Sequence, residues 1–130
     1  MNSTAWSGQS FAVLRIVTGV LFLAHGVQKY FGFPMEASFG IVQPASLLGV
    51  AGILELVGGA LIAVGLFTRP VAFVLSGMMA VAYFMMHMPK SPFPIANGGE
   101  MAVMFCFVFL YISTVGAGRW SIDASRATRR

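Results

Sequence analysis

The chain has 130 residues, of which 58% are hydrophobic and only 9% are charged. Soluble domains carry about 25% charged residues, so this composition excludes an ordinary soluble enzyme and predicts a surface that faces lipid. The formal net charge of +4 comes with no basic groove containing interleaved aromatic residues, so we expect no nucleic-acid partner. A single cysteine, Cys106, excludes an intramolecular disulfide and a cysteine-based metal site.

Four apolar segments are long enough to cross a bilayer, whose core needs about 20 residues per helix. They run over Phe11–Tyr30, Pro44–Phe67, Pro70–Met88 and Gly98–Gly116. We therefore predict an all-α fold: one transmembrane domain over residues 1–130, built as an integral membrane four-helix bundle with a short basic tail at 117–130. The residues before Phe11 contain no Lys or Arg, which argues against a cleaved signal peptide.

The first segment carries a polar stripe at helical spacing. Its members follow steps of three and four: Arg15, Thr18, Phe22, His25 and Lys29. Arg15 either reaches toward the middle of the membrane or extends to the lipid headgroups. Lys29 has the simpler interpretation of a lysine whose amine reaches the membrane surface from a helix end.

The second segment contains the most informative residue of the chain. Glu55 lies in the uncharged apolar run Ala45–Phe67, where a carboxylate costs roughly +2.5 kcal/mol or more. Gly52 and Gly59 share its helical face, and small residues let helices approach closely. Glu55 is therefore expected either to exchange protons in a buried site or to be a structural carboxyl bonded to a neighbouring helix, with Arg15 as a candidate partner.

The third and fourth segments each have a polar stripe. The members are Ser76, Ala80, Tyr83 and His87 on the third, and Glu100, Phe107, Tyr111 and Thr114 on the fourth. His87 has the alternative of a purely interfacial residue. Glu100 follows Asn97 by three residues, a spacing that also fits a helix-capping box.

If all four stripes point inward, their polar residues form one pocket. At ~1.5 Å per residue, Glu55 lies near the middle of the membrane, while the other acidic, basic and imidazole groups lie in the outer half. We predict an outward-opening pocket with Glu55 as its floor. Its remaining members are His25, Lys29, His87 and Glu100, with Arg15 on the cytoplasmic side.

The arginines predict the orientation of the chain. With four spans, six of them fall on one side: Arg15, Arg69, Arg119, Arg126, Arg129 and Arg130. The other side holds only Lys29 and Lys90. Because basic residues are retained on the cytoplasmic side, we expect both termini there, in a bacterial cytoplasmic (inner) membrane.

Several motifs together resemble those of the DoxX family. They are Arg15-x-x-x-Gly19, His25-Gly26-x-x-Lys29, Glu55-x-x-Gly58-Gly59, Gly65-x-x-Thr68-Arg69, Gly98-Gly99-Glu100 and Gly118-x-Trp120-Ser121-x-Asp123. The resemblance covers the chain from about Arg15 to Asp123. It implies a four-helix membrane protein, in a family that includes a subunit type of a thiosulfate:quinone oxidoreductase and members of membrane complexes for oxidative and thiol stress. Quinone reduction through paired cysteines, known in the wider superfamily, does not carry over, since this chain lacks them.

Three functional hypotheses follow. In the first, the chain is the membrane subunit of a quinone-linked oxidoreductase or redox-stress complex, in which His25 or His87 binds a quinone carbonyl and Glu55 exchanges protons. Four aromatic residues would suit the flat ring: Phe22, Phe84, Phe105 and Phe107. In the second, the chain is a non-catalytic membrane partner or assembly factor, which associates with other membrane or redox proteins or with itself. In the third, His25 and His87 ligate haem, or bind a metal with Glu100.

Overall fold

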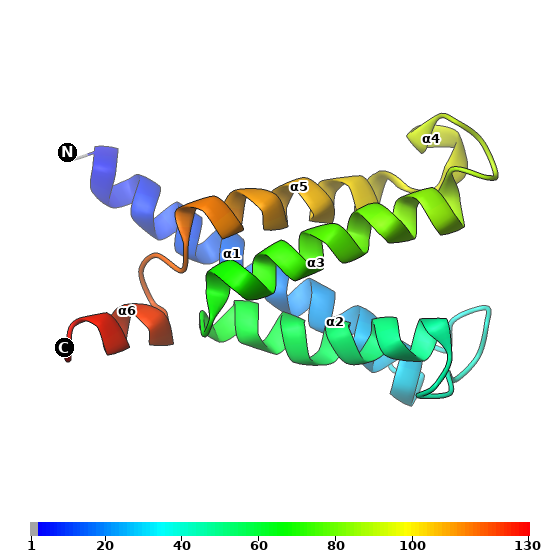
Figure 1. Cartoon of the computed structure of the whole chain (residues 1–130), viewed down its shortest axis with the longest axis horizontal. Coiled ribbons are helices and arrows are strands. Elements are labelled where there is room, and N and C mark those ends of the chain that lie inside the picture. The colour runs from blue at the N-terminus through cyan, green and yellow to red at the C-terminus, as the bar shows by residue number, and fades with distance from the viewer. Residues whose placement is uncertain (1–2) are drawn as a thin grey trace. The chain divides into compact units, whose positions relative to one another are not determined.

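A computed structural model describes residues 3–130, and Met1 and Asn2 of the predicted domain lie outside the described residues. Within that range every regular element is a helix (Figure 1). The elements are α1 (Ser3–Phe31), α2 (Leu47–Val64), α3 (Thr68–Ala82), the π-helical turn η1 (Tyr83–His87), α4 (Pro94–Asn97), α5 (Glu100–Val115) and α6 (Ile122–Ala127). The predicted all-α class is therefore confirmed.

Among the residues that the structure describes, three helical stretches are long and apolar enough to cross a membrane. They are Thr4–Phe31, Leu47–Val64 and Thr68–His87, which correspond to the first three predicted segments. The fourth predicted segment forms the shorter apolar helix Glu100–Val115. The first helix begins at Ser3, eight residues before the predicted start at Phe11.

The described chain divides into two compact units. Of the described residues, the first contains 3–68 and 117–130, with α1, α2 and α6, and the second contains 69–116, with η1, α4, α5 and almost all of α3. Each unit contains a pair of apolar helices, α1 with α2 and α3 with α5.

Glycines allow α1 and α2 to pack closely in the first unit. A Cβ atom on Gly19 would lie 2.7 Å from the carbonyl oxygen of Gly59, and one on Gly26 would lie 2.9 Å from that of Gly52. The two glycines on each helix are seven residues apart, so they line one face. Gly19 lies against Gly59, and the later Gly26 lies against the earlier Gly52, so the two helices run antiparallel. The short distances show that their backbones are in contact.

The ends of α2 have well-formed caps. The Ser46 hydroxyl accepts a hydrogen bond from the Gly49 backbone at 3.0 Å and caps the N-terminus. At the C-terminus Gly65 adopts the left-handed conformation with φ 69°, and the bonds Gly65 N–H to Ile62 and Leu66 N–H to Leu61 form a Schellman motif. A Cβ atom on Gly65 would come within 2.4 Å of Ser121 Cβ, so only glycine fits both the backbone conformation and the space.

The second unit buries apolar residues of α3 and α5. The buried face of α5 consists of Ala102, Phe105, Phe109 and Ile112. The predicted inward stripe on this helix is therefore wrong, since Glu100, Phe107, Tyr111 and Thr114 are all exposed. The sparse polar residues of a membrane helix do not have to face the protein core, and here the bulk of the aromatic and aliphatic side chains determined the buried face.

The predicted capping box at Asn97 is also absent. Helix α5 begins at Glu100 with Gly99 as its N-cap, so Glu100 is its first residue instead of its third. The Asn97 side chain instead accepts a hydrogen bond from Gly99 N–H at 2.8 Å, while its amide group donates to Ser91 O at 2.9 Å and to Tyr83 Oη at 3.1 Å. Asn97 thus holds the turn that precedes α5 against the π-helical turn η1.

Candidate functional site

A buried ion pair joins α1 to α2 in the first unit. Lys29 Nζ donates to both carboxylate oxygens of Glu55, each at 2.8 Å. The Lys29 and Glu55 side chains are only 13% and 6% exposed. Glu55 lies at the middle of the apolar helix Leu47–Val64, so the pair neutralises a charge that would otherwise be stranded in hydrocarbon.

The glycine contacts explain why Lys29 is the partner. Gly52 lacks a side chain, and a Cβ atom there would lie 3.4 Å from Lys29 Cδ, so the lysine stem runs along the α2 backbone toward Glu55. The neighbouring Tyr30 hydroxyl donates to Gly49 O at 2.6 Å and holds the end of α1 against α2. The interpretation of Lys29 as a lysine extending to the membrane surface is therefore wrong.

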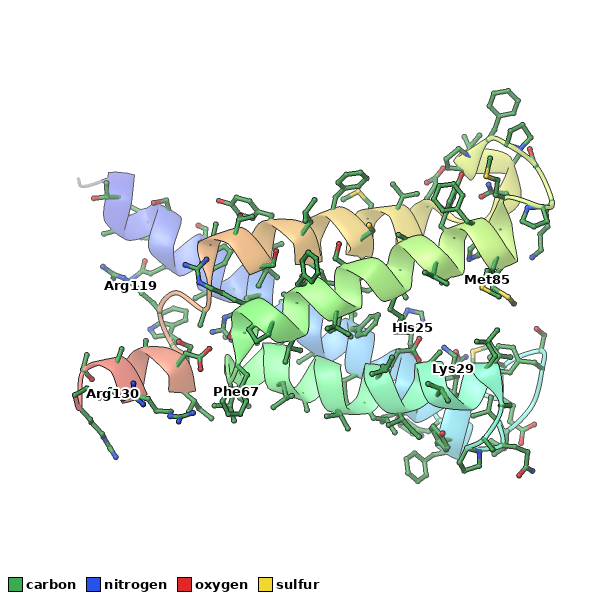
Figure 2. The ribbon with its side chains drawn as sticks, in the orientation of Figure 1. His25, Lys29, Phe67, Met85, Arg119 and Arg130 are labelled. Carbon is green, nitrogen blue, oxygen red and sulfur yellow. The ribbon has the colours of Figure 1, made fainter. Side chains whose placement is uncertain are left out.

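His25 lies on the same face of α1 as Lys29, one helical turn earlier. Its side chain is half-buried, and Figure 2 shows His25 and Lys29 on the stretch of α1 that runs beside α2. The first unit therefore brings an imidazole, an ammonium and a carboxylate onto one α1–α2 pair. These three groups were all predicted as site residues.

Arg15 has a different environment from the one predicted. Its side chain is 0% exposed, and its guanidinium donates to Ile62 O and Ala63 O, both at 2.8 Å, in the last turn of α2. The other terminal nitrogen donates to Arg119 O at 3.1 Å and to Trp120 O at 2.7 Å. The alternative of an Arg15–Glu55 pair is wrong, and the four carbonyl bonds give Arg15 a role in joining α2 to the tail.

Asp123 fixes the same end of the unit. Its carboxylate accepts from Phe67 N–H at 3.0 Å and Thr68 N–H at 2.9 Å, and its own N–H donates to Gly65 O at 2.9 Å. Partial burial acts to raise the pKa of Asp123, but hydrogen bonds from Thr68 and from the Phe67 backbone, together with the charge of Arg126, outweigh it and hold the pKa below its ordinary value. The tail is thereby bonded to the turn that follows α2.

In the second unit His87 belongs to a small polar cluster. Its Nδ1 lies 3.1 Å from Asn97 O, and its ring stacks on Tyr83 with 6.3 Å between the ring centroids. Because a carbonyl oxygen only accepts, Nδ1 carries the hydrogen in this contact and Nε2 is left as the acceptor in the neutral ring. Glu100, predicted for the same pocket, is exposed at the start of α5.

The aromatic residues proposed for a flat ring divide into two sets. Phe22 and Phe105 are buried, whereas Phe84 and Phe107 are exposed. Within residues 3–130 no group of three or more His, Cys, Asp or Glu side chains is arranged to hold a metal ion.

Sequence reasoning missed several contributors. Tyr30 and Asp123 were not recognised as hydrogen-bonding partners, although Asp123 was part of a noted motif, and Asn97 was expected to cap α5 and not to bond to Tyr83 and Ser91. A usable signal was present in that motif, because Ser121 followed by Asp123 two residues later is typical of a helix start, and the Ser121 hydroxyl does cap α6.

Comparison with known proteins agrees with this architecture. The DoxX family model matches residues 10–88. A protein of Haemophilus influenzae (strain ATCC 51907 / DSM 11121 / KW20 / Rd), with the name "Uncharacterized protein", is 46% identical over 117 residues, which cover 86% of this chain and 87% of the relative. A Bacillus subtilis (strain 168) protein with the name "Putative oxidoreductase CatD" is 27% identical over 113 residues, which cover 85% of this chain and 82% of that protein. No solved structure matches the chain. The chain belongs to the DoxX family of membrane proteins.

Proposed function

We propose that this protein is the membrane subunit of a quinone-linked oxidoreductase system, with His25, Lys29 and Glu55 as its site. The observation that carries the proposal is the buried ion pair, in which Lys29 Nζ lies 2.8 Å from both Glu55 oxygens inside apolar helices. Charged groups are rare at this depth and usually serve binding or proton transfer. The name of the Bacillus subtilis relative supports an oxidoreductase role.

The site offers the groups that a quinone head requires. Reduction of a quinone to a quinol adds two electrons and two protons, with one proton on each carbonyl oxygen. An ammonium has three N–H groups, and the bonds to Glu55 use two of those on Lys29, so a third is available for a carbonyl oxygen. Lys29 then gives one proton to the oxygen that it binds, and His25 gives the second proton to the other oxygen. Both residues regain their protons from water near the outer end of α1, and Glu55 stabilises the recharged form of Lys29.

The electrons have to come from a redox protein partner. The chain has one cysteine, so it cannot cycle between a dithiol and an intramolecular disulfide. The proposed division of work is that a partner delivers two electrons, while this subunit holds the quinone within the bilayer and supplies the protons.

We further propose that the chain crosses the membrane four times. The tail is bonded to the turn after α2 through Asp123 and Gly65, so the tail and this turn share one side. The stretch Thr68–His87 leaves that side, and Glu100–Val115 has to bring the chain back. The return helix spans about 24 Å at ~1.5 Å per residue, a length that a locally thinned bilayer accommodates. The arginine-rich side is cytoplasmic, and the polar pocket opens outward.

The test is direct recovery of the substrate. The protein is extracted from its host membrane with surrounding lipid, and bound quinone is quantified by chromatography. We expect a near-stoichiometric amount with the natural protein and a loss of at least tenfold with Lys29→Met. Lys90→Met, which removes the lysine of an exposed loop, is the matched control and should retain quinone. Absence of quinone from the natural protein, or equal recovery with Lys29→Met, would overturn the assignment.

A non-catalytic assembly role is the second candidate. It is favoured by the fact that both Glu55 oxygens are already satisfied by Lys29 without any ligand. Glu55→Gln separates the two roles. A large loss of thermal stability in detergent with function preserved in the host favours the assembly role. A stable protein that has lost quinone-reducing activity in membranes favours the site.

A further inference from the structure

We propose that the tail of the first unit carries a binding site for the headgroup phosphate of an anionic phospholipid. An open cavity of about 450 Å³ lies at this end of the unit. Its lining combines apolar and polar residues: Val64, Trp120, Ser121, Ile122, Ser125, Arg126 and Arg129. This inference does not depend on the proposed redox role, because none of the residues His25, Lys29 or Glu55 contributes to it.

The polar side of the cavity is suited to an anion. Arg126 and Arg129 line this cavity, and among residues 3–130 no salt bridge of 4.0 Å or less is formed by either, although the charge of Arg126 acts on Asp123 at longer range. Arg126 also lines a second cavity of about 380 Å³ with Asp123, Ala127 and Arg130. The Asp123 carboxylate is committed to the N–H groups of Phe67 and Thr68 and does not line the first cavity. A bidentate guanidinium suits phosphate oxygens, so Arg126 and Arg129 are the expected ligands.

The apolar side of the cavity identifies the anion as a lipid. Trp120 is 59% exposed, Phe67 is 54% exposed, and the Arg126 guanidinium lies 5.4 Å from the centroid of the Phe67 ring. Val64, on the cavity wall, is the last residue of the apolar helix α2. Aromatic residues beside arginines at the end of a membrane helix are typical of the headgroup region, where a phosphate meets acyl chains.

The backbone holds Trp120 in this position. Trp120 has a φ of 54°, in the left-handed region that tryptophan rarely adopts, and its carbonyl accepts a hydrogen bond from buried Arg15 at 2.7 Å. The next residue, Ser121, caps α6 through Ala124 N–H at 3.1 Å. The backbone of Trp120 is therefore fixed beside the cavity, which favours a preformed site.

The experiment uses Trp120 as its reporter. Trp6→Phe leaves Trp120 as the single tryptophan of the full chain in detergent micelles. Phosphatidylglycerol or phosphatidylcholine with brominated acyl chains is then titrated, and quenching of Trp120 fluorescence is recorded. We expect half-maximal quenching by phosphatidylglycerol at a concentration at least fivefold lower than by phosphatidylcholine. Since each basic residue near an anionic surface contributes about fivefold, Arg126→Gln with Arg129→Gln should raise that concentration about 25-fold.

A variant elsewhere controls for the loss of positive charge. Lys90→Gln removes a lysine from an exposed loop that does not line the cavity and should change the phosphatidylglycerol titration by less than threefold. Equal quenching by the two lipids in the Trp6→Phe chain, with Arg126 and Arg129 unchanged, overturns the proposal. So does an unchanged titration in the Arg126/Arg129 variant. Displacement of phosphatidylglycerol by millimolar inorganic phosphate would assign the site to the free anion and overturn the lipid assignment.

Discussion

At the residue scale, each buried charged side chain has a partner that compensates for the loss of water around its charge. Glu55 binds Lys29, and Arg15 binds four backbone carbonyls. The Arg15 charge also lies at the C-terminal end of α2, where the partial negative charge of the helix dipole favours a cation. Two opposite charges on neighbouring helices thus found separate partners instead of each other.

We predict that single and double changes at the ion pair will not be additive. Glu55→Leu leaves Lys29 buried without its counter-ion and should lower the unfolding free energy by about 3–5 kcal/mol. Lys29→Met with Glu55→Leu removes both charges and should cost about 1 kcal/mol or less. Chemical unfolding in detergent micelles measures both values. Equal destabilisation by the single and the double variant would mean that packing, and not the charge, sets the cost.

Asp123 should make the stability of the folded protein depend on pH. Because its folded pKa lies below the unfolded value, its contribution is complete above the ordinary pKa near 3.8 and is lost as the pH falls through the lower, folded pKa. Melting temperatures of the natural protein and Asp123→Asn should therefore differ at pH 6 and converge as the pH falls through the folded pKa, which lies below the ordinary value. A difference that persists unchanged at low pH would show that the carboxylate charge is not responsible.

At the element scale, the glycine contacts between α1 and α2 determine which residues meet. The register that places Gly19 against Gly59 also places Arg15, four residues earlier, against Ala63, four residues later. Glu55 is then out of reach of Arg15. The sequence was sufficient to predict helices, apolar spans and glycine packing, because these follow from composition and spacing. The choice between Lys29 and Arg15 as partner of Glu55 depends on helix register, which spacing along one helix does not determine.

The residues of the candidate site also fall into those that the sequence could predict and those that it could not. His25, Lys29 and Glu55 were predicted from their polarity in apolar segments, and the structure gathers them on one helix pair. The buried face of α5 was predicted incorrectly, because a polar stripe has no obligatory direction where lipid and protein are both apolar. Backbone contacts such as those of Asp123 were not predictable, since they require the fold of distant turns.

Two glycine-to-alanine changes in helix interiors should have opposite effects. In Gly59→Ala the new methyl group would lie 2.6 Å from Leu23 N, so α1 and α2 must separate and the melting temperature should fall by several degrees. In Gly77→Ala nothing lies within 4 Å, and the better helix former should be neutral or stabilise by about 0.5–1 kcal/mol. Thermal unfolding of both variants in the same detergent makes the comparison. A loss in Gly77→Ala as large as in Gly59→Ala would contradict close packing as the cause.

At the scale of the whole molecule, both units use an arginine to bind the backbone carbonyls at the end of a helix. In the first, Arg15 of α1 binds carbonyls at the end of α2. In the second, Arg69 near the start of α3 binds the carbonyls of Ser113, Thr114 and Val115 at the end of α5. Each helix pair is thus joined at one end by an arginine from its first helix, which covers carbonyls that a helix end leaves without partners.

The proposed four crossings predict which positions a membrane-impermeant thiol reagent reaches. In a Cys106→Ala background, Ser38→Cys and Lys90→Cys should react in intact cells. Thr128→Cys should react only after the membrane is permeabilised, because the tail shares a side with the turn after α2. Labelling with a charged maleimide and gel-shift detection gives the result. Reaction of Thr128→Cys in intact cells would contradict the orientation and the return crossing by Glu100–Val115.

The hydrogen bonds from Arg15 to the carbonyls of Arg119 and Trp120 make the stability of the first unit depend on the final residues of the chain. A nonsense codon after Ala117 would leave the helices α1 to α5 intact. The buried Arg15 guanidinium would lose two of its four carbonyl acceptors, and the N–H groups of Phe67 and Thr68 would lose the Asp123 carboxylate that accepts from them. We expect such a truncated product to unfold more readily than the full chain and to be present in the membrane at a lower level.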